Sequence, residues 1–138
     1  MMHTDYPVEA GDFTRAGEAS ADIKRRLRQL GVSTELLRRV AVASYELELN
    51  IVIHSVGGQL SLEVDSQCVR LSSSDRGPGI VDVAQAMREG YSTANDEARS
   101  MGFGAGMGLP NMRRNADVFT IDSVPGRGTD IQMLFELA

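Results

Sequence analysis

The stretch from Val40 to His54 reads VAVASYELELNIVIH, and it is a long stretch with a regular apolar period. Its apolar residues recur at helical spacing, which predicts a largely buried helix from about Leu36 to His54. Within this helix Glu46 and Asn50 are four residues apart, so they project from the same face. A carboxylate in apolar surroundings is unfavourable unless it is paired or binds something. The helix is therefore both a core element and a candidate site.

The Glu46–Asn50 pair has two interpretations. It forms either a polar seam that bonds to neighbouring backbone, or a site where a carboxylate takes a proton and an amide oxygen holds a hard cation. A second carboxylate, Glu48, is rotated by roughly 200° around the helix from this pair. We therefore expect Glu48 to be solvated or paired on the surface.

The segments around this helix alternate between helical and strand patterns. The predicted elements are strand His3 to Val8, helix Asp12 to Leu30, strands Gln59 to Val64 and Gln67 to Ser72, helix Val81 to Glu89, a helix from Leu109 to Asn115, and strands Asp117 to Val124 and Thr129 to Leu137. Ser33 or Thr34 can cap the long helix. The order predicts an α+β, two-layer sandwich with helices on one face of a mixed, mostly antiparallel sheet. The length of 138 residues fits one domain over residues 1–138.

Charge and composition exclude several classes of protein. The net charge is −5, from 14 basic and 19 acidic side chains, whereas a nucleic-acid-binding protein needs a basic excess. The single cysteine, Cys68, cannot form an intramolecular disulfide, and we expect a buried thiol in a reducing compartment. No apolar run approaches the ~18 residues of a membrane helix, and Met1 to Ala10 does not resemble a signal peptide. These features predict a cytoplasmic protein.

An aspartate and two glycines follow the second predicted hairpin strand, in Asp75-Arg76-Gly77-Pro78-Gly79. A carboxylate at a strand end can accept a hydrogen bond from an exocyclic amino group such as that of adenine. Glycines allow a ring to lie close against the backbone. The alternative is an ordinary turn.

A second glycine motif precedes the predicted helix at Leu109. Its glycines occupy every second position: Gly102, Gly104, Gly106 and Gly108. Such spacing exposes backbone amides, and a helix N-terminus adds partial positive charge, so the arrangement suits a phosphate chain. The irregular segment from Gly90 to Gly106 is typical of a lid or binding loop. A flexible linker is the alternative.

Together these motifs resemble the GHKL ATPases, the superfamily of DNA gyrase and of histidine-kinase catalytic domains. The resemblance rests on Glu-x-x-x-Asn, Asp-x-Gly-x-Gly, the glycine-rich lid and Gly126-Arg127-Gly128-Thr129, in that order, and covers roughly Val40 to Ala138. Gly90-Tyr91-Ser92-Thr93 and Gly106-Met107-Gly108-Leu109-Pro110 are most similar to the anti-sigma-factor and stressosome-type serine/threonine protein kinases.

The resemblance implies a role for each motif residue. Glu46 would be the general base or would orient the attacking hydroxyl, and Asn50 would ligate Mg²⁺. Asp75 would bind the adenine amino group, with Thr129 supporting it through water. The adenine pocket would be shaped by Gly77 and Gly79. The triphosphate would be wrapped by the loop and helix start, at Gly102, Gly104, Gly106, Met107, Gly108 and Leu109.

By the same resemblance, the protein is expected to be an ATP- and Mg²⁺-dependent serine/threonine kinase. Its partner would be a STAS-domain antagonist, a sigma factor or both, with no nucleic acid and no membrane, and a homodimer is compatible with the pattern. One alternative is an ATP-gated switch that holds a partner with little catalysis. Another is a histidine-kinase-like module acting in trans, which the carboxylate at Glu46 disfavours because those kinases usually carry Asn there.

Overall fold

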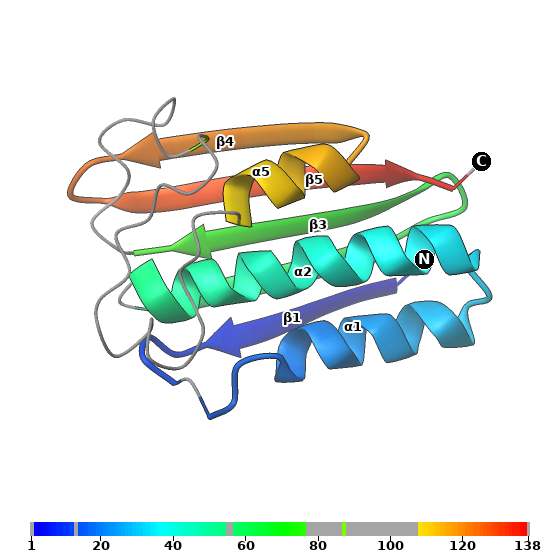
Figure 1. The fold of residues 1–138 in the computed structure, drawn as a ribbon, viewed down its shortest axis with the longest axis horizontal. Helices are drawn as coiled ribbons and strands as arrows, with labels where there is room; N and C mark the ends of the chain where they lie inside the picture. The colour runs from blue at the N-terminus through cyan, green and yellow to red at the C-terminus, as the bar shows by residue number, and fades with distance from the viewer. Residues whose placement is uncertain (1, 13, 55–56, 77–86, 88–107, 138) are drawn as a thin grey trace.

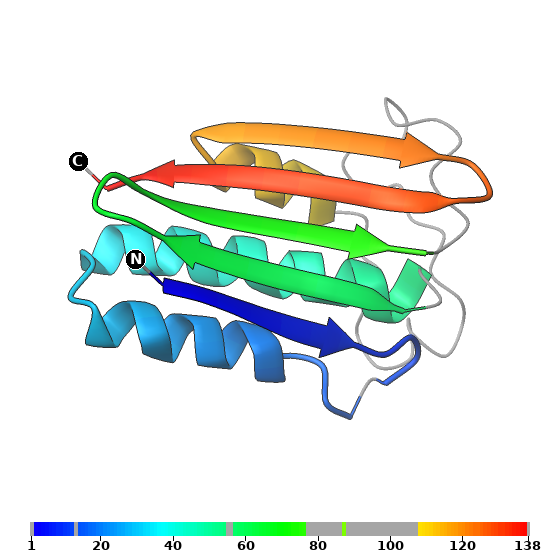
Figure 2. The same ribbon diagram turned by 180° about the vertical axis from the view of Figure 1, so that it is seen from behind.

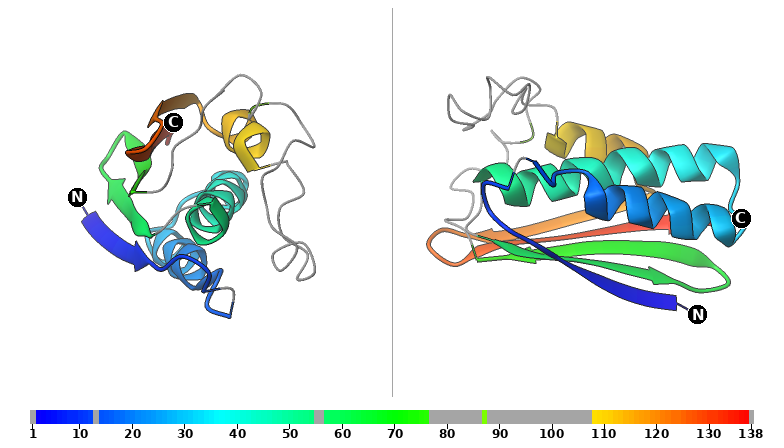
Figure 3. Two further views of the ribbon diagram at one scale, coloured as in Figure 1. Left: turned by 90° about the vertical axis from the view of Figure 1, so that its left-hand side faces the viewer. Right: turned by 90° about the horizontal axis from the view of Figure 1, so that it is seen from below.

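The computed structural model describes residues 2–12, 14–54, 57–76, 87 and 108–137. Its elements are β1 (Met2–Val8), α1 (Glu18–Gln29), α2 (Thr34–His54), β2 (Gly58–Val64), β3 (Cys68–Asp75), α5 (Gly108–Asn115), β4 (Val118–Val124) and β5 (Gly128–Glu136). The strands form one sheet in the order β1-β2-β3-β5-β4. The three helices lie on one face of this sheet (Figures 1 and 3), and the other face is open to the viewer in Figure 2. This confirms the predicted α+β, two-layer class.

The sheet is antiparallel at every strand pair that the structure describes. Alternate residues of the central strands turn toward the helices, as period-2 patterns require. The most deeply buried of these are Leu60, Leu62, Val69, Leu71, Ile131, Met133 and Phe135. They pack with the apolar face of α2 and with Ile23 and Leu27 of α1. The buried face of α2 therefore forms the centre of the helical layer that covers the sheet.

The helix boundaries differ from the prediction mainly at α1. The helix begins at Glu18 rather than Asp12. Gly17, just before it, adopts a left-handed conformation at φ 102°, so the right-handed helix does not extend further toward the N-terminus. Leu30, predicted as the last residue of this helix, lies past its end and is 53% exposed. For α2, Ser33 is the capping residue, since its Oγ accepts a hydrogen bond from Leu36 N at 3.2 Å.

The predicted helix from Val81 to Glu89 and the predicted lid up to Met107 lie outside the described residues, except for Met87. That side chain is partly buried and packs against the core. No helix in the described part of the chain is long and apolar enough to cross a membrane.

Candidate functional site

Four structural elements meet at one end of the molecule. They are the C-terminal half of α2, the end of β3, the start of β5 and the start of α5, which lie toward the left in Figure 1 and in the right-hand view of Figure 3. This arrangement follows from the antiparallel order, because β3 ends where β5 begins. Most of the predicted site residues that the structure describes lie on these four elements.

Glu46 and Asn50 converge on the first residue of α5. A β-carbon added at Gly108 would lie 3.2 Å from Glu46 Oε2 and 3.4 Å from Asn50 Oδ1. The distance to Glu46 Oε2 is tighter than ordinary van der Waals contact and the distance to Asn50 Oδ1 is at its lower limit, so a larger residue at position 108 would press mainly on the Glu46 oxygen. The structure thus brings Glu46, Asn50 and Gly108 together, and the glycine places no side chain against the two oxygens.

The Glu46 carboxyl group is half-buried, and its burial raises its pKa. One hydrogen bond opposes this effect, since Asn111 Nδ2 donates to Glu46 Oε1 at 3.4 Å. The other oxygen, Oε2, lies beside the α5 N-terminus, where backbone N–H groups provide partial positive charge. A carboxylate with a raised proton affinity beside an anion-binding helix end can accept a proton next to a phosphate group.

Asp75 and Thr129 form a second cluster where β3 and β5 pair. Asp75 Oδ1 accepts a hydrogen bond from Thr129 N at 3.3 Å, and Thr129 Oγ1 lies 2.8 Å from Ser123 Oγ. The approach depends on Gly128, whose φ is 138° and where an added β-carbon would overlap the Asp75 carbonyl oxygen. Gly58 pairs with Asp75 on the other side, where a β-carbon would lie 2.9 Å from Asp75 Cα. Because both neighbouring strands have a glycine here, their backbones can approach that of Asp75 closely.

Several predicted site residues cannot be placed. Gly77, Gly79, Gly102, Gly104, Gly106 and Met107 lie outside the described residues. Leu109 is described, and its side chain belongs to the hydrophobic core. Its backbone, in the first turn of α5, remains the part that can face a ligand.

The prediction that Glu48 is solvated or paired on the surface was wrong. The side chain is buried, with the residue only 3% exposed. Glu48 Oε1 accepts a hydrogen bond from Ser20 N at 3.0 Å, and Oε2 accepts one from Ala19 N at 3.2 Å. The carboxylate therefore caps the first turn of α1, where the helix dipole also favours negative charge. The prediction failed because it left out the helix that covers this side of α2.

Asn111 is a site residue that the sequence analysis did not identify. It lies in α5, one residue after Pro110, and its side chain contacts Glu46. A polar residue in the first turn of a helix is common, so the sequence pattern alone carries no signal for this contact.

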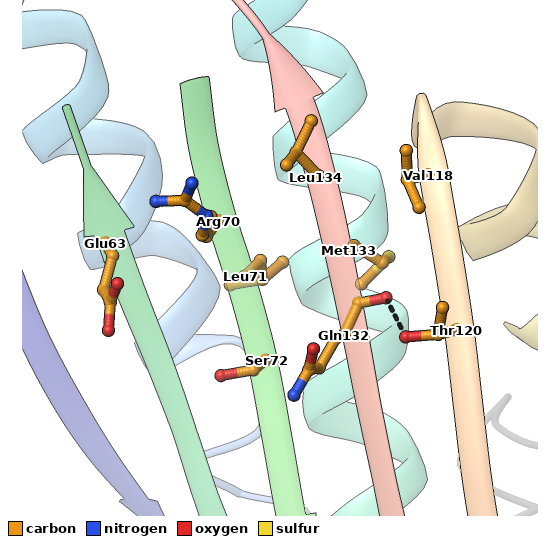
Figure 4. Close-up of a pocket in the computed structure, with 9 residues that line it drawn as sticks. All are labelled: Glu63, Arg70, Leu71, Ser72, Val118, Thr120, Gln132, Met133 and Leu134. Carbon is orange, nitrogen blue, oxygen red and sulfur yellow. Dashed lines mark hydrogen bonds between the residues drawn. The ribbon is translucent and has the colours of Figure 1, made fainter. Parts of the chain in front are cut away.

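A hollow of about 350 Å³ lies elsewhere, over β2, β3, β5 and β4 (Figure 4). Its lining residues are Glu63, Arg70, Leu71, Ser72, Val118, Thr120, Gln132, Met133 and Leu134. None of them belongs to the Glu46 or Asp75 clusters. The hollow is therefore separate from the candidate site.

Comparison with known proteins agrees with this geometry. Residues 35–138 match the family described as histidine kinase-, DNA gyrase B-, and HSP90-like ATPase. The serine/threonine-protein kinase RsbT of Bacillus subtilis is 33% identical over 111 residues, covering 78% of this chain and 77% of RsbT. The anti-sigma F factor of Pasteuria penetrans is 33% identical over 137 residues, covering 91% of this chain and 88% of that protein.

The fold itself recurs in a solved structure, the mycobacterial sensor histidine kinase MprB. The two superpose with a TM-score of 0.56 at 17% sequence identity, over 96% of this chain and 97% of that one. From the match over most of its length and from its relatives, the chain belongs to the family of histidine kinase-, DNA gyrase B-, and HSP90-like ATPases.

Proposed function

We propose that the protein binds ATP with Mg²⁺ and transfers the γ-phosphoryl group to a serine or threonine of a regulatory protein. The observation that carries this proposal is the convergence of the Glu46 carboxylate and the Asn50 amide oxygen on Gly108, at the start of α5. A relative that is named a serine/threonine-protein kinase supports the same activity. The family supports ATP as the nucleotide.

The donor set at this site fits a magnesium–phosphate group. Mg²⁺ prefers hard oxygen ligands and usually takes one or two from protein and the rest from phosphate and water. Asn50 would hold the ion, since its Oδ1 lies beside Gly108, where no side chain intervenes between the oxygen and the start of α5. When bound, Mg²⁺ neutralises charge on the phosphate oxygens.

The nucleotide would be held by two groups of residues. Asp75, supported by Thr129, would accept the hydrogen bond from the adenine amino group, with Gly77 and Gly79 beside the ring. The triphosphate would lie along Gly102, Gly104, Gly106, Met107, Gly108 and Leu109, ending at the positive end of α5.

In the transfer step, Glu46 accepts the proton of the partner's hydroxyl group. The hydroxyl oxygen forms a bond to the γ-phosphorus while the bond from that phosphorus to the β,γ-bridging oxygen breaks. ADP leaves with the bonding electron pair. The raised pKa of Glu46 makes its carboxylate a stronger base than an exposed glutamate.

The partner is proposed to be a STAS-domain antagonist protein. A second function, an ATP-gated switch that binds a sigma factor and transfers phosphate rarely, is favoured by the relatives named anti-sigma F factor. Both functions use the same nucleotide site. A cytoplasmic location and a homodimer are compatible with either.

The test is transfer of label from γ-³²P-ATP to candidate STAS-domain proteins, with Asp75→Asn as the matched variant. We expect labelled phosphoserine or phosphothreonine with the wild type and no transfer from GTP, which presents a carbonyl where adenine has its amino group. Asp75→Asn should weaken ATP binding by at least the ~1.5–3 kcal/mol of a hydrogen bond to a charged group. Equal use of ATP and GTP would contradict the adenine assignment. ATP-dependent partner binding without any transfer would favour the switch.

A further inference from the structure

Helix α5 is attached to α2 at both of its ends. At its C-terminus, Arg39 Nε donates to Asn115 O at 2.8 Å, and Arg39 Nη2 donates to Asp117 Oδ1 at 3.1 Å. A cation is favourable there because the last carbonyl groups of a helix carry partial negative charge. Near its N-terminus, Asn111 contacts Glu46. These attachments hold α5 in a defined position along α2.

The side-chain amide of Asn111 has a defined orientation. Its Oδ1 accepts a hydrogen bond from Arg114 Nη1 at 3.2 Å, which leaves Nδ2 to donate to Glu46 Oε1. The reversed amide would place two donors together at Arg114 and two acceptors together at Glu46. Arg114 therefore determines which end of the amide meets the carboxylate.

The two oxygens of Glu46 have different surroundings. Oε1 accepts the amide proton of Asn111, whereas Oε2 lies beside Gly108 and faces the same space as Asn50 Oδ1. Without the contact to Asn111, the three side-chain torsions of a glutamate would let the carboxylate turn away from that space. In the observed rotamer the hydrogen bond from Asn111 engages Oε1, and Oε2 lies on the side of Gly108 and Asn50.

We propose that Asn111 is a positioning residue for phosphoryl transfer: it holds Glu46 through Oε1, so that Oε2 is the oxygen that takes the proton of the partner's hydroxyl group. Arg114 orients the Asn111 amide for this purpose. The proposal rests on the proposed kinase function. It concerns a residue outside the motifs that identified the site.

The kinetic test compares the same substitution one helical turn apart. Asn111→Leu removes the donor at similar volume, and Asn111→Asp keeps the shape and the Arg114 contact but presents only acceptors to Glu46. Asn115→Leu is the control, because Asn115 Nδ2 contacts the carbonyl oxygen of Asn111 and not Glu46. With γ-labelled ATP and the STAS-domain protein that accepts label, we expect single-turnover transfer to fall about tenfold in Asn111→Leu and in Asn111→Asp. ATP affinity in Asn111→Leu should change less than twofold, and Asn115→Leu should transfer at the wild-type rate.

A double-mutant cycle separates positioning from loss of structure. If Asn111 acts through Glu46, Asn111→Leu should have no further effect on the rate in a Glu46→Gln background. Multiplicative losses of rate would overturn the proposal, as would a wild-type rate in Asn111→Leu.

A measurement on the full chain without nucleotide tests the contact independently of the kinase function. In ¹⁵N NMR spectra, the side-chain NH₂ resonances of Asn111 should shift on Glu46→Gln, and those of Asn115 should not. An Asn111 resonance that does not respond would overturn the proposal. If the resonance responds but the wild type transfers no phosphate to any partner, the kinase function fails while the orienting contact is supported.

Discussion

Each of two flanks of α2 carries a glutamate, and the surroundings of the two carboxylates differ. On the α5 flank, Glu46 accepts one long hydrogen bond, stays half-buried and has a raised pKa. On the α1 flank, Glu48 accepts two backbone N–H groups from the first turn of α1 and is almost fully buried. Both carboxylates face the start of a helix. They differ in how many hydrogen bonds their oxygens accept from the described residues.

This difference in hydrogen bonding suits the two carboxylates to different roles. A buried carboxylate that receives backbone donors stabilises the fold, because its charge is compensated within the protein. Among the described residues, the hydrogen bond that Glu46 accepts comes from the Asn111 side chain at Oε1, and burial raises the pKa of this carboxyl group, so its charged form is only partly compensated there. Binding of a ligand or a proton to Glu46 can compensate the rest of this charge. We therefore propose that the flank facing α5 is the reactive side of α2 and that the flank facing α1 is the supporting side.

The largest expected effect is on the reactive side. Glu46→Gln keeps the volume and removes the basicity, so phosphoryl transfer should fall by about 10²- to 10⁴-fold, the usual contribution of general-base assistance. ATP binding should survive. Single-turnover rates with the labelled partner and calorimetry with ATP measure the two quantities. Transfer at the wild-type rate would show that another group is the base.

Glu48→Gln should reverse that pattern. The amide cannot accept as strongly from both Ala19 N and Ser20 N, and it loses the favourable charge at the helix start. We expect unfolding in urea to need about 1–3 kcal/mol less free energy than in the wild type, with ATP affinity unchanged. Unchanged stability together with lost phosphoryl transfer would mean that the roles of the two glutamates are exchanged.

A smaller effect on stability is expected at Asp22, a second carboxylate that holds α1 in place. Asp22 accepts hydrogen bonds from Tyr6 Oη at 2.6 Å and from Arg26 Nε at 2.8 Å, and it is also paired with Arg25. These contacts hold the pKa of Asp22 well below its usual value. The lowered pKa stabilises the fold above the unfolded-state value of about 4, and this stabilisation is lost as the pH falls through the folded-state value.

Asp22→Asn should therefore reduce the free energy of unfolding at pH 7 by about 1 kcal/mol, since the site is partly exposed and screened by water. The difference between wild type and variant should shrink as the pH is lowered below 4. Thermal unfolding at a series of pH values measures it. A difference that stays constant down to pH 2 would mean that the Asp22 charge does not stabilise the fold.

Local patterns in the chain were sufficient for most of the architecture. The 3.6-residue period from Leu36 to His54 and the period-2 runs of the strands reflect which face of each element is buried, so they predicted the elements and the two-layer class. Spacing alone also placed Glu46 and Asn50 on one face, because helix geometry is the same in every fold. The ordered motifs then indicated the ATPase family, which the comparisons confirm.

Contacts between elements distant in sequence followed from none of these patterns. Glu48 meets Ala19 and Ser20 across 29 and 28 residues, and Asn111 meets Glu46 across 65. A periodicity shows which side of a helix is apolar, but a polar side chain on either side is compatible with solvent, a cap or a ligand. Which of these it meets depends on the neighbouring helix that packs there, and that packing is a property of the folded chain as a whole.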